Sequence, residues 1–248
     1  MYALIIPPAR SAVTVSLITE LAARLRAIAD ALPMEALESG RESLETAIHT
    51  LTPVADGGSS PLPEHALAHF SGALNHVENA RGHMPRCHDL IILYAATILG
   101  HGWVVAPPRY HGAPFNADYE DWVRRECGGP PGREYLVVRG DEKVLFDAAR
   151  TEQRDGIPVE VLIDAKGRYA QFIDKATGEF HSWWAESRRS GLPKLKERAL
   201  DQVQVGAGRP VEWWCAERNV ARLLNGIFAL DNRLAGRIRA VHRPMPPE

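Results

Sequence analysis

The sequence predicts an α+β protein in which a helical N-terminal domain precedes a domain that contains both strands and helices. Three observations lead to this fold class. Apolar residues recur at helical spacing through the N-terminal part, a proline- and glycine-rich segment interrupts the chain at 106–114, and β-branched and aromatic runs follow it. The predicted order after the interruption is α, β, β, β, α, β, α.

The N-terminal part, residues 1–105, is expected to form an all-helical domain used for docking or delivery. Leucine and isoleucine residues keep the three- and four-residue spacing of one helix face over 17–32 and again over 34–51. Residues 53–63 are rich in Pro, Gly and Ser and predict a turn. A further helical stripe and an apolar helix near 86–101 complete the predicted domain.

Residues 106–114, "APPRYHGAP", are expected to be a linker because they mark the strongest change of composition in the chain. The second domain is expected to cover residues 115–248. Its predicted elements are a helix at 116–127, strands at 133–138, 143–149 and 159–166, a helix at 193–205, a strand at 210–217 and a helix at 218–240.

Net charge and cysteine content exclude some classes of protein. A formal net charge of −2 does not fit a surface permanently coated with nucleic acid or bound to an anionic membrane. Cys87, Cys127 and Cys215 are widely spaced and form no CxxC motif, so we expect free thiols and a reducing compartment. With 45% apolar residues the chain has enough hydrophobic material for a buried core.

The sequence predicts neither a secretory signal peptide nor a membrane span. The N-terminus, "MYALIIPPARSAV", lacks a positively charged start, and Pro7 and Pro8 interrupt its apolar stretch. The longest apolar block, 90–106, is interrupted by Gly100 and Gly102 and is shorter than the ~20 residues that a spanning helix needs. We therefore expect a protein that is cytoplasmic in the producing cell and is exported, if at all, without a signal peptide.

Two aspartates and a lysine are predicted to meet on one face of the sheet. Side chains alternate along a strand, so Asp164 and Lys166 lie on the same face of the strand at 159–166. The pair Asp155-Gly156 favours a tight hairpin turn between this strand and the preceding one. If that pair centres the hairpin, the register places Asp147 opposite Asp164.

This arrangement indicates a metal site, because like charges that face each other across strands need a cation or a raised pKa to compensate them. Two carboxylates beside a lysine suit a hard divalent ion, Mg²⁺ or Mn²⁺, which prefers oxygen ligands. Lys166 would then orient water or stabilise charge on a phosphate, as phosphodiester hydrolysis requires. The simpler alternative is a solvated sheet face with an ordinary cross-strand ion pair.

The residues around the two aspartates resemble a known nuclease signature. "FDA" at 146–148, followed by "LIDAKG" at 162–167 within the predicted element order, is similar to the D…(D/E)xK motif of the PD-(D/E)xK, or restriction-endonuclease-like, superfamily. Residues 115–225 most resemble the restriction-endonuclease-fold toxin 5 family, with "VEWWCAE" at 211–217 as a further matching segment. The resemblance implies a restriction-endonuclease-like αβββαβ core with a mixed sheet.

The resemblance also implies which residues form the site. Asp147 and Asp164 would be the metal ligands, and Lys166 would be the catalytic lysine. An acidic or amide residue from the first helix of the core is implied as well, and Glu120 matches this position better than the alternative, Glu126. Gln202 would come from the later helix, where helical spacing turns its side chain toward the sheet.

By this resemblance the chain is expected to be a metal-dependent DNase toxin that a type VI secretion system delivers and that acts in the target-cell cytoplasm. A cognate immunity protein and a spike-tip (PAAR-type) protein or chaperone are the implied partners. The chain departs from the family at Asp164, where Glu is more usual, and at Ala148, where glycine is usual. These departures leave open a catalytically inactive binding or adaptor protein on the same fold, and an RNase using the same residues is a third possibility.

Overall fold

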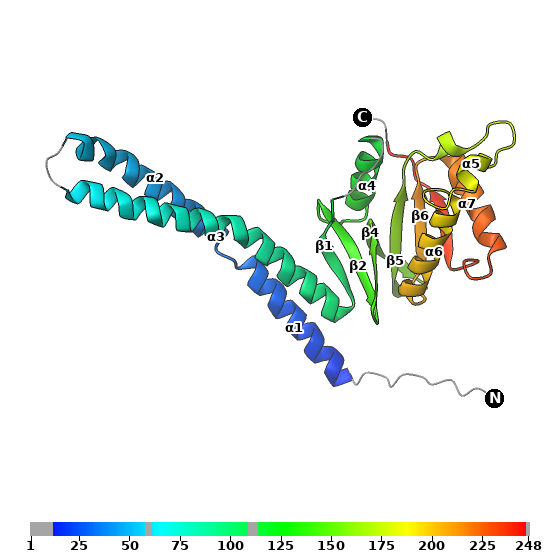
Figure 1. Cartoon of the computed structure of the whole chain (residues 1–248). Coiled ribbons are helices and arrows are strands. Elements are labelled where there is room, and N and C mark those ends of the chain that lie inside the picture. The colour runs from blue at the N-terminus through cyan, green and yellow to red at the C-terminus, as the bar shows by residue number, and fades with distance from the viewer. Residues whose placement is uncertain (1–11, 58–60, 109–113, 247–248) are drawn as a thin grey trace. The chain divides into compact units, whose positions relative to one another are not determined.

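The computed structural model describes residues 12–57, 61–108 and 114–246, and the chain forms two compact units, Met1–Ala95 and Ala96–Glu248. The described part of the first unit is helical, and the second unit combines strands and helices (Figure 1). The α+β class predicted from the sequence is therefore confirmed. Within the described residues, no helix combines the length and the apolar character needed to cross a bilayer.

The first unit is built from long helices, which are α1 (Ala12–Asp30), α2 (Met34–Gly57) and α3 (Leu62–Leu99), the last of which continues into the second unit. Figure 1 shows α2 and α3 side by side, and an ion pair of 2.7 Å between Arg81 and Glu38 joins them. The sequence predicted two separate helices in the α3 region. The structure has one continuous helix, because Pro85 is accommodated within it.

The helical part ends earlier than the expected boundary at residue 105. α3 stops before Gly100, whose φ of 83° is a conformation that glycine adopts without steric penalty, and β1 (His101–Val105) follows at once. β1 pairs antiparallel with β2 (Arg133–Arg139), so residues 101–105 belong to a sheet of the second unit. The expected linker at 106–114 is described only at its ends, since 109–113 lie outside the described residues.

The strands of the second unit form two sheets, with the orders β1-β2-β3 and β4-β5-β6-β7. The remaining strands are β3 (Glu142–Phe146), β4 (Ala148–Arg154), β5 (Ile157–Lys166), β6 (Val211–Cys215) and β7 (Ile238–His242). β4 runs antiparallel to β5, whereas β5, β6 and β7 are parallel, so the second sheet is mixed. This mixture agrees with the predicted α+β arrangement.

The predicted hairpin register is confirmed. Asp155 and Gly156 both have positive φ, 53° and 78°, as the tight turn between β4 and β5 requires. Ala148 pairs with Ile163, and the register continues without a slip to the turn. Asp147 is therefore the next residue beyond this pair and lies beside Asp164.

Helices cover both faces of the mixed sheet (Figure 1). α4 (Pro114–Glu126) packs on the face that carries Val161, Ile163 and Trp214. The other face carries Leu162 and Trp213. It packs against η1 (Ala170–Phe172), α5 (Ser182–Ala185), α6 (Leu192–Gly206) and α7 (Arg218–Leu230). The alternation predicted for β5 is thus confirmed, because its odd- and even-numbered apolar residues enter different core clusters.

Two predicted elements need correction. The strand expected at 143–149 is broken at Asp147, and its halves β3 and β4 belong to different sheets, because the chain bends there to pass from one sheet to the next. The helix expected at 218–240 ends at Leu230, and β7 follows. Gly236, with a φ of 72°, lies in the intervening turn, and the alternating burial of β7 is the period-two pattern of a strand.

Candidate active site

Asp147, Asp164 and Lys166 meet where β3 ends and β4 begins, against the last residues of β5. All three side chains are buried. The backbone N–H of Ala165 donates a hydrogen bond of 2.6 Å to Asp147 Oδ2, which fixes this carboxylate against β5. The structure therefore brings together the three residues that the alternation and the hairpin register predicted.

Lys166 and Asp164 form a buried ion pair within one strand. Lys166 Nζ donates to Asp164 Oδ2, and the exposed fractions of the two side chains are 7% and 1%. Lys166 Nζ also lies 4.3 Å from the centre of the Trp213 ring, whose face attracts a cation. The lysine is thus held in place by the carboxylate and by the neighbouring strand β6.

Gln202 extends the network from α6 to Asp164. Trp213 Nε1 can only donate a hydrogen bond, and it donates to Gln202 Oε1 at 2.6 Å. The other end of the Gln202 amide, its NH₂ group, is therefore left to face Asp164. Gln202 Nε2 then donates to Asp164 Oδ1 at 2.9 Å. Gln202 is fully buried, in the direction that the helical spacing predicted, and it acts on the site through Asp164.

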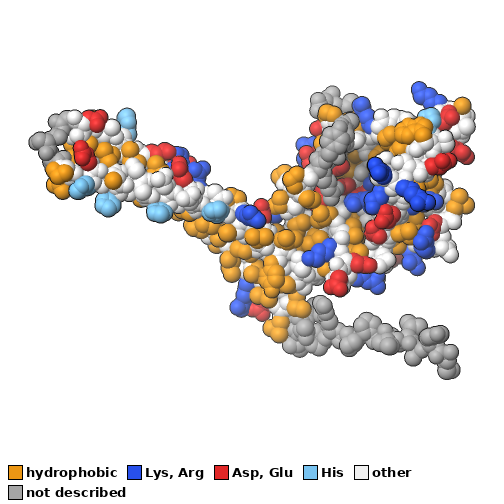
Figure 2. Space-filling model, in the orientation of Figure 1, with side chains coloured by type: hydrophobic (Ala, Val, Ile, Leu, Met, Phe, Trp, Pro, Cys, Tyr) orange, Lys and Arg blue, Asp and Glu red, His pale blue; other side chains and the backbone are white. Residues whose placement is uncertain are grey.

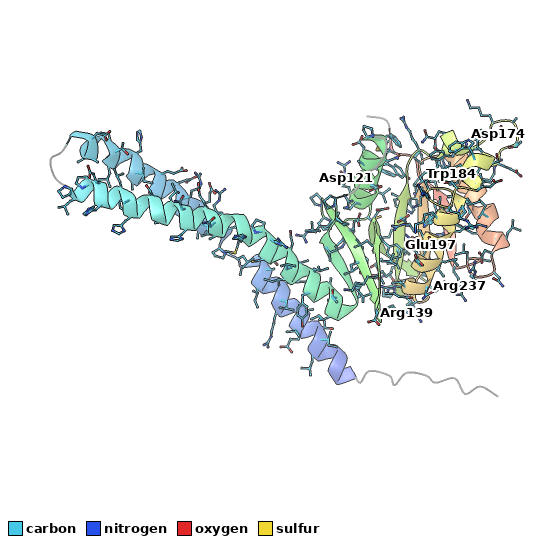
Figure 3. All side chains as sticks on the ribbon, in the orientation of Figure 1. Asp121, Arg139, Asp174, Trp184, Glu197 and Arg237 are labelled. Atoms are coloured by element: carbon cyan, nitrogen blue, oxygen red, sulfur yellow. The ribbon has the colours of Figure 1, made fainter. Side chains whose placement is uncertain are left out.

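Arg198, one turn before Gln202 on α6, is a site residue that the sequence did not indicate. Its Nη2 and Nε lie 2.6 and 3.2 Å from Asp164 Oδ1, and Nη2 also donates to the carbonyl oxygen of Leu145 at 3.1 Å. In the sequence Arg198 follows Lys194, Lys196 and Glu197, which is typical of a solvated helix face. Glu197, its neighbour on α6, is labelled in Figure 3.

The structure places Glu120, and not Glu126, near the aspartates. Glu120 is half-buried on α4, and its negative charge contributes to the raised pKa of Asp147. Glu126 is the last residue of α4 and is exposed. Of the two helix acids considered from the sequence, Glu120 is therefore the one that interacts with the candidate site.

The two aspartates have opposite pKa shifts. The pKa of Asp147 is raised to about 7, first by burial and then by the charges of Asp164 and Glu120. Burial also acts to raise the pKa of Asp164, but the cationic groups of Arg198 and Lys166 outweigh it and hold this pKa well below its usual value. Carboxyl pairs whose environments separate their pKa values are typical of catalytic sites.

Lys166 remains protonated at neutral pH. Burial acts to lower its pKa, but the interactions with Asp164, Tyr169 and Asp147 together outweigh burial, so that the pKa is raised overall. A lysine held in this state supplies a fixed positive charge and does not take up a proton. The chemistry that such a group can perform is electrostatic stabilisation of a developing negative charge.

The donor set fits a hard divalent cation. Asp147 and Asp164 offer carboxylate oxygens, and Mg²⁺ is commonly held in proteins by one or two carboxylates together with substrate phosphate oxygens. A bound cation would offset the negative charges that raise the pKa of Asp147. Over the described ranges, no group of three or more His, Cys, Asp and Glu residues forms a ready-made metal cluster.

The chain that follows Lys166 is anchored from two sides. Glu217 Oε2 accepts hydrogen bonds from the backbone N–H groups of Tyr169 at 2.7 Å and Ala170 at 2.6 Å. On the other side, Asn116 Oδ1 of α4 accepts a hydrogen bond of 2.9 Å from Arg168 N. These contacts fix the direction in which the chain leaves β5 and so support the position of Lys166.

A concave feature whose lining does not include the candidate site residues lies at the C-terminal end of α6. It is a cleft of about 1110 Å³ lined by several arginines, two of which, Arg139 and Arg237, are labelled in Figure 3. Arg139 donates to the carbonyl oxygen of Gln204 in the last turn of α6, and Arg209 pairs with Glu160 at 2.7 Å. Arg139 thus caps a helix and Arg209 neutralises a nearby acid, which are structural roles.

No protein-family model matches this chain, and no curated protein matches it in sequence.

Proposed function

We propose that the second unit is a metal-dependent nuclease of the PD-(D/E)xK type that hydrolyses phosphodiester bonds in DNA. The observation that carries the proposal is the buried meeting of Asp147, Asp164 and Lys166, in which the two carboxylates have opposite pKa shifts. The mixed sheet supports it, and so does the order α4, β2, β3, β4, β5, α6, β6. This is the αβββαβ order that the resemblance implies once β3 and β4, the two halves of one predicted strand, are counted together and the short helices η1 and α5 are left aside.

Each site residue has a distinct task in this proposal. Asp147 and Asp164 would hold the cation, which when bound supplies Lewis-acid polarisation of the scissile phosphate. Lys166 keeps its proton and stabilises the negative charge that develops on the phosphate oxygens. Gln202, itself oriented by Trp213, holds Asp164 in position. Glu120 would complete the acidic side of the site from α4.

Plasmid DNA with purified protein and Mg²⁺ tests the proposal. The wild-type chain should degrade the plasmid, whereas Asp164→Ala, Lys166→Ala and added EDTA should each reduce cleavage by at least about 100-fold, as expected when charge stabilisation is removed from such a site. Asp141→Asn is the matched control, because Asp141 is an exposed aspartate in the turn between β2 and β3. Intact plasmid with folded wild-type protein would end the nuclease proposal, and the same assay with RNA decides which nucleic acid is cut.

One observation favours an alternative, a binding or adaptor protein that has lost catalysis. Both oxygens of Asp164 already accept hydrogen bonds, from Lys166 on one side and from Arg198 and Gln202 on the other. Calorimetric titration with Mg²⁺ separates the two functions. An adaptor should take up no Mg²⁺ at the aspartates, whereas a nuclease should bind it and lose that binding in Asp164→Ala.

The family resemblance extends the proposal to an antibacterial toxin that a type VI secretion system delivers. The expected partners are a cognate immunity protein and a PAAR-type spike-tip protein or chaperone. Expression of the wild-type chain inside a bacterial host should stop growth, and expression of Lys166→Ala should not. Co-expression of a small neighbouring gene that restores growth would identify the immunity protein, and equal growth of both strains would argue against a toxin.

A further inference from the structure

Asp164 accepts hydrogen bonds from three side chains, those of Lys166, Gln202 and Arg198. Lys166 Nζ donates a hydrogen bond to Oδ2. Oδ1 accepts hydrogen bonds from Gln202 Nε2 at 2.9 Å and from Arg198 Nη2 at 2.6 Å. A divalent cation that uses Oδ1 must take the place of at least one of these donors, because a cation and an N–H group cannot approach the same lone pair.

The three donors differ in how easily they can move away from Asp164. Lys166 is buried and lies against the Trp213 ring, and Gln202 is buried and fixed by the Trp213 N–H group. The Arg198 side chain is 37% exposed. Its remaining hydrogen bond, to the Leu145 carbonyl oxygen, is 3.1 Å long and uses the same Nη2 atom. Arg198 is therefore the most exposed of the three donors and the one best placed to turn toward solvent.

We infer that Arg198 competes with the divalent cation for Asp164: its guanidinium occupies Oδ1 in the metal-free protein and leaves this oxygen when the cation binds. This inference rests on the proposed metal-dependent function. It makes Arg198 a positioning residue that sets how tightly the cation is held. Removal of a positive charge a few ångströms from a cation site should strengthen cation binding, because the two charges repel each other in a partly buried environment.

The test is calorimetric titration of metal-free protein with Mn²⁺, at neutral pH and without substrate. Arg198→Met keeps the length of the aliphatic chain but removes the charge, and it should bind Mn²⁺ about tenfold more tightly than the wild type. Arg198→Lys keeps a charge and should stay close to the wild type. Arg209→Met is the matched control, because Arg209 also pairs with an acid of β5, Glu160, but outside the site, and its affinity should not change.

Two further measurements exclude other causes. In an Asp164→Asn background, Mn²⁺ binding should be weak or lost and Arg198→Met should not restore it, because the competition is for the Asp164 carboxylate. Thermal unfolding followed by circular dichroism shows whether each variant is folded, and Arg198→Gln, which retains a hydrogen-bond donor, replaces Arg198→Met if the latter does not fold. A merely structural role for Arg198 would weaken Mn²⁺ binding when it is removed.

The outcomes separate this inference from the proposed function. Tighter binding in Arg198→Met that depends on Asp164 supports the competition. Equal or weaker binding in this variant, with a wild type that binds Mn²⁺ and cleaves DNA, overturns the competition and leaves the nuclease proposal standing. The absence of binding in the wild type and in Arg198→Met overturns both.

Discussion

Asp147 and Asp164 are the same residue type and lie side by side, yet their surroundings give them opposite titration behaviour. Asp164 has Lys166 and Arg198 as cationic neighbours, and its pKa is lowered. Asp147 is buried and close to the charges of Asp164 and Glu120, which together raise its pKa to about 7 against the opposing effect of the hydrogen bond from Ala165 N. Near neutral pH the site therefore holds one permanently ionised carboxylate and one that is partly protonated.

The raised pKa of Asp147 predicts that the metal-free protein loses stability as the pH rises. The native state binds this proton more tightly than the unfolded state, so the stabilisation is complete below the ordinary pKa of 3.8 and is lost as the pH rises through about 7. Asp147→Asn has no ionisable carboxyl group at this position and so avoids this loss of stability, while its side-chain oxygen still accepts the hydrogen bond from Ala165 N. We expect the variant to be more stable than the wild type at pH 8, by up to about 4 kcal/mol.

Urea denaturation in EDTA at pH 5 and pH 8 measures this difference. The advantage of Asp147→Asn should shrink toward pH 5, because protonated Asp147 is then the major form in the native state. Asp141→Asn should show no comparable change. A variant that is less stable than the wild type at pH 8 would show that Asp147 is not destabilised by its neighbours.

At the residue level, the sequence predicted those site residues whose positions depend on local rules. Asp164 and Lys166 share a face because strands have a period of two, and Asp147 joins them because Asp155 and Gly156 form a tight turn. Arg198 could not be found in this way. Its partner Asp164 is 34 residues away in the chain, and that contact depends on how α6 packs on the sheet.

At the level of elements, the site depends on how α4 meets the end of β5. Gly167 follows Lys166 directly, and a Cβ atom at this position would lie 2.2 Å from Asn116 Oδ1 and 3.3 Å from Asn116 Cα. Asn116 Oδ1 also accepts the hydrogen bond from Arg168 N. The absence of a side chain at residue 167 thus allows α4 to approach the backbone beside the candidate lysine.

Gly167→Ala should therefore destabilise the protein by about 1 to 3 kcal/mol, because Asn116 must move and lose its hydrogen bond to Arg168. The same substitution should be less costly in an Asn116→Ala background, where the nearest clashing atoms are absent. Urea denaturation of the two single variants and the double variant gives this coupling.

Gly226→Ala on α7 is the control, because a Cβ atom there meets no atom within 4 Å. Gly128→Ala is unsuitable as a control because Gly128 has a positive φ. Strictly additive effects would contradict the predicted contact.

Elements with clear periodicity were predicted, and those that depend on distant partners were not. The helix α6 and the strands β2, β5 and β6 lie within a few residues of the predicted positions. β1 and β7 were missed, since each is short and is stabilised by pairing with a strand far away in the sequence. The break at Asp147 was missed for a related reason, because two separate sheets divide one continuous apolar run.

At the level of the whole molecule, the two units differ in what they bury. Large aromatic and aliphatic side chains fill the core of the second unit, with Trp213, Phe146 and Phe228 among them. In the described part of the first unit, the fully buried apolar residues are the alanines Ala22, Ala29 and Ala95. Several large apolar side chains of this unit are exposed instead, and Figure 2 shows apolar groups at its surface.

This difference predicts unequal independent stability of the two units. A fragment of residues 96–248 should unfold cooperatively and at a temperature that does not depend on concentration, because it contains both sheets and their core. A fragment of residues 1–95 should be weakly helical when dilute, since isolated helices without a large buried core are marginal in water. Its helix content should rise with concentration as exposed side chains such as Leu17, Ile28 and Tyr94 associate. Thermal unfolding of both fragments, followed by far-UV circular dichroism at two concentrations, measures this difference. A cooperative, concentration-independent transition of the 1–95 fragment would show that alanine packing and the α2–α3 contacts suffice to fold it alone.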